Sequence, residues 1–331
     1  MIEHVDSVSI ILPNYNHALF LRERIETVLS QVRPYDEIIF LDDASTDDSV
    51  AIAKNLLQHA PCPVIYDINT LNSGSPFCQW NKGFKHVSKN WIWIAETDDA
   101  CHPDFLKRVL GAALQNGSDF AYAQSYYVDE QGVKQFSDYV RMNKMGRHYF
   151  DTDFTKPGLE LVHKFFSKTN CIPNASAVVF NASLIKKVGY ANESFYFTGD
   201  WEFWIRLVMN RNVSFVAEEL NYFRFHPATT RAIKRNRKRD VESLTCQLLA
   251  KFFRRYPHYV GEKQLTPTHN NKGSLMPNKK FPGQFIKLDQ VPRYTSTYVW
   301  LYTTYIKLKS IPSLPFRFIK RLYRKMKMKE I

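Results

Sequence analysis

The 331 residues provide room for one large domain, or for one domain with an extension. An apolar fraction of 44% is too high for a disordered chain, and no apolar run reaches the roughly 18 residues of a membrane-spanning helix. The formal net charge of +13 indicates an anionic partner, which could be a phosphorylated small molecule, nucleic acid or an anionic membrane face.

The cysteines and the first residues indicate where the protein resides. Five cysteines are an odd number, and their spacing matches neither a zinc site nor a disulfide framework. This pattern is typical of a reducing, cytoplasmic environment. The first residues carry neither a basic start nor a long apolar stretch, so we expect no signal peptide.

The chain begins with an alternation of strand and helix patterns. Residues 8–12 form a short apolar run that predicts a buried strand. Leu21, Ile25 and Val28 then recur at helical spacing and predict the buried stripe of a helix. The charged residues between them are expected to face solvent: Arg22, Glu23, Arg24 and Glu26.

The alternation continues through the first half of the chain. Further strands are predicted at residues 37–41, 63–66 and 91–95, and further helices at residues 49–57, at 79–87 and from Pro103 onward. This order predicts a mostly parallel sheet covered on both faces. The less regular second half predicts strands at residues 119–127 and 175–180, one or two strands at 213–225, and a helix at 203–209.

Two adjacent carboxylates, Asp98 and Asp99, follow the predicted strand at residues 91–95. Such a pair is costly to bury without positive charge, and a divalent cation shared with a phosphate is the usual solution. Ligands of open α/β sheets bind beyond the carboxyl ends of the strands. We therefore expect the polar residues that end three strands to meet there: Asn14 and Asn16, Asp42 and Asp43, Asp98 and Asp99.

Three motifs at these strand ends point to a known family. They are Pro13-Asn14-Tyr15-Asn16, then Asp42-Asp43-Ala44-Ser45-Thr46-Asp47, then Glu96-Thr97-Asp98-Asp99 followed by Pro103. Together they closely resemble the family 2 glycosyltransferases, an inverting group with the GT-A fold, over roughly residues 7–226. The resemblance implies a Rossmann-like mixed α/β sheet flanked by helices. The implied catalytic domain is residues 1–228, with a nucleotide-binding part at about 1–100 and an acceptor part at 101–228, and residues 229–331 form a mostly helical, basic extension.

The resemblance also implies a binding site for a nucleoside diphosphate sugar, with uracil as the expected base. It places Pro13 and Tyr15 in the base pocket and Asp43 in a hydrogen bond with the base. Ser75 would lie near the donor, and Asp98 would bond the ribose.

The same resemblance implies that Asp99 ligates Mn²⁺ or Mg²⁺ at the diphosphate. The family usually has aspartate where this chain has Glu96, a replacement that keeps the charge. His226 matches a position where many relatives carry histidine, and it could approach the metal or the phosphates. A lone histidine in such a place is more often structural.

The catalytic base of such enzymes is commonly an aspartate within Glu-Asp, followed by an aromatic residue and a helix. The matching segment here begins Gly199-Asp200-Trp201, so glycine replaces the glutamate. Asp200 is the expected base that takes the acceptor hydroxyl proton. The alternative is that Asp200 caps the helix, and Glu202 is then the fallback base.

The C-terminal residues 307–331 carry nine basic residues and one acid, interleaved with apolar residues at helical spacing. This composition favours a basic amphipathic helix on an anionic membrane surface, with a solvated tail as the alternative. A nucleic-acid partner is not expected, because the chain contains no recognised nucleic-acid module.

These patterns predict a metal-dependent inverting glycosyltransferase at the cytoplasmic face of the cell membrane. Its acceptor would be a glycan or a lipid-linked glycan in bacterial surface polysaccharide assembly, such as O-antigen, capsule or exopolysaccharide. One alternative is a sugar nucleotidyltransferase, although residues 13–16 lack the glycine of its usual loop. The other is a non-catalytic nucleotide-sugar-binding protein tethered to membrane or nucleic acid, for which Gly199 gives some support.

Overall fold

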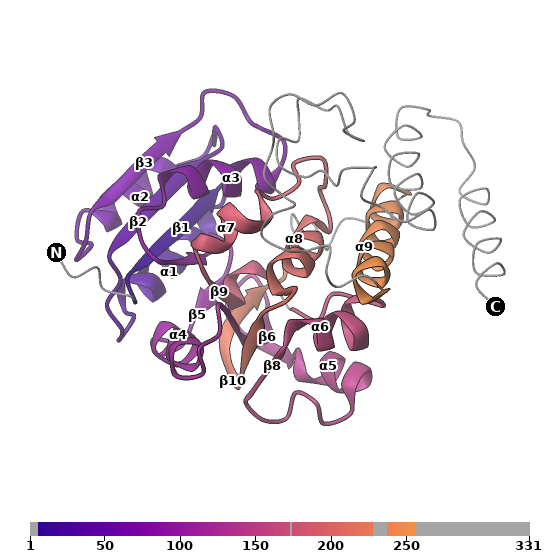
Figure 1. The fold of residues 1–331 in the computed structure, drawn as a ribbon. Helices are drawn as coiled ribbons and strands as arrows, with labels where there is room; N and C mark the ends of the chain where they lie inside the picture. Colours follow the sequence, from indigo (N-terminus) through magenta and orange to yellow (C-terminus); the bar gives the residue numbers. More distant parts are fainter. Residues whose placement is uncertain (1–5, 173, 228–236, 256–331) are drawn as a thin grey trace.

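The computed structural model describes residues 6–172, 174–227 and 237–255. In this part of the chain ten strands form one mixed sheet with helices on both faces (Figure 1). The strands are β1 (Val8–Asn14), β2 (Glu37–Asp42), β3 (Val64–Ile68), β4 (Trp91–Ile94), β5 (Ala100–Cys101), β6 (Phe120–Val128), β7 (Lys134–Ser137), β8 (Phe154–Pro157), β9 (Val178–Asn181) and β10 (Asn212–Arg224). The α-helices are α1 (Ala18–Leu29), α2 (Ser49–Leu57), α3 (Pro76–His86), α4 (Phe105–Gln115), α5 (Tyr139–Gly146), α6 (Gly158–Leu161), α7 (Ser183–Val188), α8 (Gly199–Val208) and α9 (Arg237–Arg255).

The first half of the sheet is parallel, as the alternation predicts. Strand β1 pairs in parallel with both β2 and β4, and β2 pairs in parallel with β3. The register places Asn14 opposite Asp42. The carboxyl ends of β1, β2 and β4 are therefore neighbours, which confirms that the polar residues after these strands share one edge.

The second half turns the sheet into a mixed one. Strand β9 is antiparallel to both β4 and β6, while β6 runs parallel to β10. The predicted strand at 175–180 starts late, because Ala175–Ala177 form a 3₁₀ turn before β9 begins. The segment predicted at 213–225 is a single strand, β10, whose register shifts between Val216 and Asn221.

Apolar residues on both faces of the sheet form the core. Helices α1, α2 and α4 cover one face, and α3, α7 and α8 cover the other. Aromatic side chains fill the second face, where Trp80 of α3 packs against Phe203 and Trp204 of α8. This contact joins a helix of the first half of the chain to a helix of the second half.

Arg24 of α1 is fully buried, contrary to the expectation that it faces solvent. Its Nε donates to the backbone carbonyl of Glu96 at 2.8 Å, and its guanidinium carbon lies 5.5 Å from the centre of the Trp93 ring. The prediction from helical spacing was wrong for Arg24, because its guanidinium packs against the acidic residues that follow β4.

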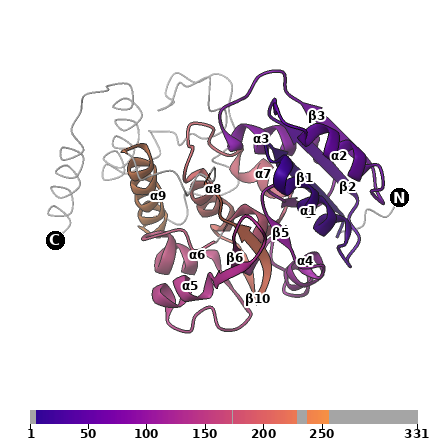
Figure 2. The same ribbon diagram turned by 180° about the vertical axis from the view of Figure 1, so that it is seen from behind.

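Helix α9 lies beyond the predicted domain boundary at residue 228 and packs on the described part of the fold that precedes that boundary. Its Cys246 and Ala250 are buried against the core that contains α8. In both views α9 lies beside α8, and α2 lies on the opposite side of the described residues (Figures 1 and 2). The basic segment at 307–331 falls outside the described residues. Among the described helices, none is both long and apolar enough to cross a bilayer.

Candidate active site

A cavity of about 540 Å³ opens where β1, β2 and β4 end, and both halves of the chain contribute to its wall. Seven of the eight residues predicted for the site line this cavity: Pro13, Tyr15, Asp43, Ser75, Asp98, Asp99 and Asp200. The eighth, His226, lies directly behind the cavity wall, where its Nε2 is 3.2 Å from Oδ2 of Asp98. The fold therefore brings the predicted residues into one place.

The turn after β2 positions Asp43. Asp42 accepts hydrogen bonds from the Asn14 side chain at 2.8 Å and from the backbone N–H of Ser45 at 2.8 Å. Ala44 adopts a positive φ of 61°, a conformation that residues other than glycine take up only where surrounding contacts enforce it. The turn thereby directs the Asp43 carboxylate into the cavity.

Asp43 organises the loop that leads into α3. Its Oδ1 accepts hydrogen bonds from Asn69 Nδ2 at 2.6 Å, the Ser73 backbone N–H at 2.8 Å and Gln79 Nε2 at 2.7 Å. Ser75 follows in this loop, and its hydroxyl donates to the carbonyl of Phe195 at 3.4 Å. Asp43 thus fixes the shape of the wall where the nucleotide base is expected.

Asp99 fastens the end of β4 to the second half of the chain. Its Oδ2 accepts hydrogen bonds from Asn174 Nδ2 and Ser176 Oγ, both at 2.6 Å, and its Oδ1 accepts one from the Arg224 backbone N–H at 3.0 Å. Burial, together with the charge of Asp98, raises the pKa of this carboxyl above its usual range. Both oxygens of Asp99 are therefore engaged by protein donors.

Asp98 lies in a cluster with His17 and His226, whose ligand atoms all lie within 4.8 Å of one another. Burial opposes ionisation of Asp98, but the positive charges of His17 and His226 and the hydrogen bond from His226 hold its pKa below its ordinary value. Sequence reasoning missed His17. Its position just after β1, at the same edge of the sheet, was the available signal.

The hydrogen bonds of Thr97 fix the tautomer of His17. The Thr97 hydroxyl donates its single proton to the Pro13 carbonyl at 2.9 Å, and its oxygen lies 2.9 Å from His17 Nδ1. Nδ1 must therefore carry the proton, so in the neutral ring Nε2 is the atom with a lone pair. Two imidazoles and one carboxylate are a donor set suited to a divalent transition metal.

Glu96 is more than a replacement that keeps the charge. Its Oε1 accepts a hydrogen bond from Trp80 Nε1 at 2.7 Å. Burial, reinforced by the charge of Asp98, raises the pKa of Glu96 to about 8. In this arrangement the side chain is mostly protonated at neutral pH.

Asp200 lies in the first turn of α8, where the helix dipole favours a carboxylate. Thr198 occupies the position that precedes the helix, so Asp200 is not the capping residue. Its Oδ2 accepts a hydrogen bond from Asn170 Nδ2 at 2.9 Å. The fallback residue, Glu202, is buried in a two-fold ion pair with Arg206 at 2.8 and 2.9 Å, away from the role of a base.

The glycine at position 199 has a packing reason. A Cβ built on Gly199 would lie within 2.8 Å of three ring carbons of Phe77. Phe77 is buried in α3 and packs edge-on against Trp80 at 5.0 Å between ring centres, so it has little room to move. Helix α8 can therefore begin against α3 only if residue 199 has no side chain.

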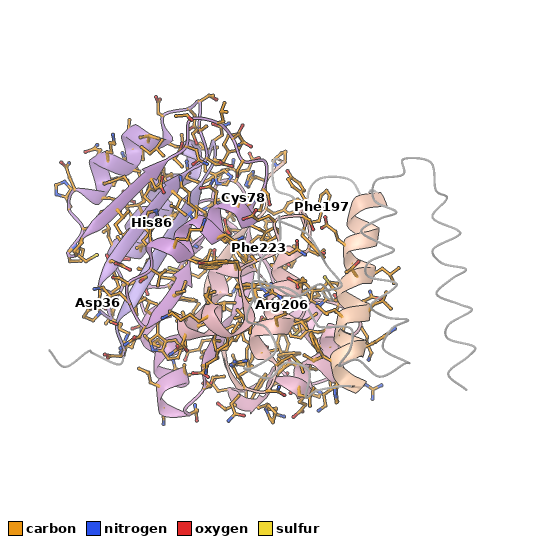
Figure 3. All side chains as sticks on the ribbon, turned by 45° about the horizontal axis from the view of Figure 1, so that its top comes forward. Asp36, Cys78, His86, Phe197, Arg206 and Phe223 are labelled. Carbon is orange, nitrogen blue, oxygen red and sulfur yellow. The ribbon has the colours of Figure 1, made fainter. Side chains whose placement is uncertain are left out.

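Helix α9 supplies the carboxylate that holds the loop before α8. Glu242 is buried and accepts hydrogen bonds from the backbone N–H groups of Tyr196, Phe197 and Thr198 at 3.0, 2.7 and 3.1 Å. Figure 3 shows Phe197 beside α9. The loop residues line the cavity together with Ser243 of α9, so this helix forms part of the site wall.

The family model described as Glycosyl transferase family 2 matches residues 9–170. An uncharacterized glycosyltransferase of Rickettsia typhi is 25% identical over 246 residues, which are 74% of this chain and 72% of the relative. An uncharacterized glycosyltransferase of Haemophilus influenzae is 30% identical over 125 residues, or 38% of this chain and 49% of the relative.

Two groups of solved structures share the fold. S. aureus TarS, residues 1–349, in complex with UDP-GlcNAc has a TM-score of 0.58 at 16% identity, covering 77% of this chain and 70% of that one. The mannosyltransferase PcManGT from Pyrobaculum calidifontis, in complex with GDP-Man and Mn²⁺, has a TM-score of 0.53 at 15% identity, covering 76% and 69%. These likenesses confirm the predicted GT-A fold.

We expect Gly199→Ala to lower the free energy of unfolding by about 1–3 kcal/mol, because the added methyl group overpacks against Phe77. The matched control is Gly111→Ala in α4, where an added Cβ meets nothing within 4 Å. That control should be neutral or slightly stabilising. Urea unfolding measures both, and an equal response of the two variants would contradict the packing explanation.

We expect Glu242→Ala to lower the free energy of unfolding by at least about 2 kcal/mol, because three backbone donors lose their acceptor. Gln247→Ala on the same helix is the control, since it removes only an exposed hydrogen bond to the Lys168 carbonyl. Thermal unfolding followed by circular dichroism compares them. A Glu242 variant as stable as the control would show that α9 does not hold the loop.

Proposed function

Because this chain belongs to the family 2 glycosyltransferases, we propose that it moves a sugar from a nucleoside diphosphate donor to an acceptor hydroxyl, with inversion at the anomeric carbon. One observation carries the proposal: the acidic end of β4 and the carboxylate of Asp200 face the same cavity from opposite halves of the chain. A UDP-sugar is the preferred donor, in line with the UDP-GlcNAc complex of TarS.

The donor half of the cavity supports binding of the nucleotide. Pro13 and Tyr15 offer an apolar wall for the base, and Tyr15 remains 44% exposed. Asp43 provides a carboxylate, held in place by the loop, for an N–H of the base. Ser75 lies at the start of α3, next to this wall.

We place a divalent cation, Mn²⁺ rather than Mg²⁺, at the cluster of His17, Asp98 and His226, because Mg²⁺ prefers oxygen ligands. The donor set fits a divalent cation, since two ring nitrogens and a carboxylate oxygen already converge there. When bound, the cation would act as a Lewis acid that stabilises the charge of the diphosphate leaving group. The placement differs from the sequence-based one, in which Asp99 was the ligand and Asp98 contacted the ribose, because the ring nitrogens of His17 and His226 converge on Asp98.

We propose Asp200 as the general base. It would accept the proton of the acceptor hydroxyl while the hydroxyl oxygen bonds to the anomeric carbon. The bond from that carbon to the diphosphate breaks at the same time, and its electron pair leaves with the nucleotide. This direct displacement inverts the anomeric centre and needs no nucleophile from the protein.

The biological setting remains part of the proposal. We propose a glycan or lipid-linked glycan as acceptor, in assembly of bacterial surface polysaccharide at the cytoplasmic face of the membrane. The net charge of +13 supports attraction to an anionic surface. The packing of Gly199 against Phe77 removes the main support for a non-catalytic alternative, because the glycine has a structural reason.

We expect Asp200→Asn to lower transfer by at least about 100-fold, because the amide cannot take the hydroxyl proton. UDP affinity, measured by calorimetry with Mn²⁺ present, should stay within about twofold of the wild type, since Asp200 is not among the nucleotide-binding residues. A screen of UDP-, GDP- and TDP-sugars for hydrolysis or thermal stabilisation identifies the donor. Wild-type protein that binds none of them would contradict the proposal.

We expect His17→Ala and Asp98→Ala each to weaken Mn²⁺-dependent UDP binding by at least about tenfold, because each removes one metal ligand. His59→Ala, on an exposed part of the chain after α2, serves as the control. Titration with Mn²⁺ followed by electron paramagnetic resonance measures the free ion directly. Unchanged Mn²⁺ affinity in both variants would place the metal elsewhere.

A further inference from the structure

We propose that Asn170 is the positioning residue of the general base, an inference that rests on the proposed function and goes beyond it. Asn170 lies in the loop between the π-helical turn Val162–Phe166 and the 3₁₀ turn Ala175–Ala177. Like Asp200, it lines the cavity. Its Nδ2 donates to Oδ2 of Asp200 at 2.9 Å.

The orientation of the Asn170 amide is set by a second hydrogen bond. Its Oδ1 accepts from the backbone N–H of Ile172 at 3.1 Å. A backbone N–H can only donate, so the amide oxygen must face Ile172. The amide nitrogen is consequently directed at Asp200, and a flipped amide would lose both hydrogen bonds.

An ion pair in turn holds the backbone of Asn170. Arg141 donates from Nη1 to the Asn170 carbonyl at 2.9 Å. The same guanidinium forms two hydrogen bonds with the buried carboxylate of Asp138, at 2.7 and 2.8 Å. A two-fold bond of this kind fixes the plane of an arginine. A chain of hydrogen bonds therefore links Asp200, through Asn170 and Arg141, to the buried carboxylate of Asp138. Each group in this chain is held in place by its neighbours.

The hydrogen bond has two consequences for a base. It restricts rotation of the Asp200 carboxylate, so that an oxygen can be held within reach of the acceptor hydroxyl. It also favours the charged form of the carboxylate, the form that accepts a proton. Four elements contribute other charged or titratable groups around Asp200. Helix α8 contributes Glu202 with Arg206, and α9 contributes Glu242 with Cys246. The start of α5 contributes Arg141 with Asp138, and the end of β4 contributes Glu96 with Asp98.

The test compares Asn170→Ala and Asn170→Asp with Asn116→Ala, whose side chain bonds only its own helix on the surface. We expect Asn170→Ala to lower kcat by roughly 10- to 100-fold, as when a catalytic group is misplaced by about an ångström. Donor KM and UDP affinity with Mn²⁺ should stay within about twofold, which also establishes that the variant is folded. The acidic limb of the kcat/KM profile should move to higher pH, and further in Asn170→Asp, where two carboxylates face each other.

The outcomes distinguish this inference from the proposed function. If Asp200→Asn abolishes transfer while Asn170→Ala keeps both kcat and the acidic limb of the wild type, Asn170 is not a positioning residue. If kcat falls in Asn170→Ala but the acidic limb moves in neither Asn170 variant, the role is merely structural and the inference is also overturned. If Asp200→Asn retains full transfer, the assignment of the base fails, and the inference fails with it.

Discussion

The crowding of three acidic side chains within four residues, at the end of β4, is the constraint that organises this structure; Asp99 is buried, and Glu96 and Asp98 are half-buried. Glu96, Asp98 and Asp99 would repel one another and lose hydration unless positive groups surround them. Arg24 donates to the backbone carbonyl of Glu96, and His17 and His226 lie beside Asp98. Protonation of Glu96 relieves part of the repulsion, because burial and the charge of Asp98 raise its pKa to about 8. The two histidines and Asp98 leave a set of groups on the cavity side that could hold a cation.

The same carboxylates connect the two halves of the chain. Asp99 accepts hydrogen bonds from Asn174, Ser176 and the backbone of Arg224, so the end of β4 is tied to segments of the second half of the chain. The Arg224 guanidinium adds a bond to the Asp98 carbonyl at 2.9 Å. The two sides of the cavity are thereby built on one hydrogen-bonded network, which suits the direct displacement proposed above.

Whether a feature of the fold or the site could be predicted depends on how far apart in the sequence the interacting residues lie. The strand ends were predictable because periodicity and adjacency in a parallel sheet are local rules. Asp200, in contrast, was predicted only from the resemblance of residues 199–201 to a family motif. The exposure of Arg24 was predicted wrongly, because helical spacing does not indicate which side of a helix packs against the acidic residues after β4. Glu242 and Asn170 could not be found at all, since their partners are 44 and 30 residues away and their own sequence surroundings carry no motif.

The start of α8 shows why the site depends on packing as much as on motifs. Gly199 lets α8 approach α3 until Phe77 fills the space of a side chain, and Trp80 of α3 then contacts both Trp204 of α8 and the carboxylate of Glu96. The helix that presents Asp200 is therefore in direct contact with the helix that borders the acidic strand end. A larger residue at position 199 would push Asp200 away from the acidic end of β4, so the departure from the family motif preserves the distance between the proposed base and the proposed donor site.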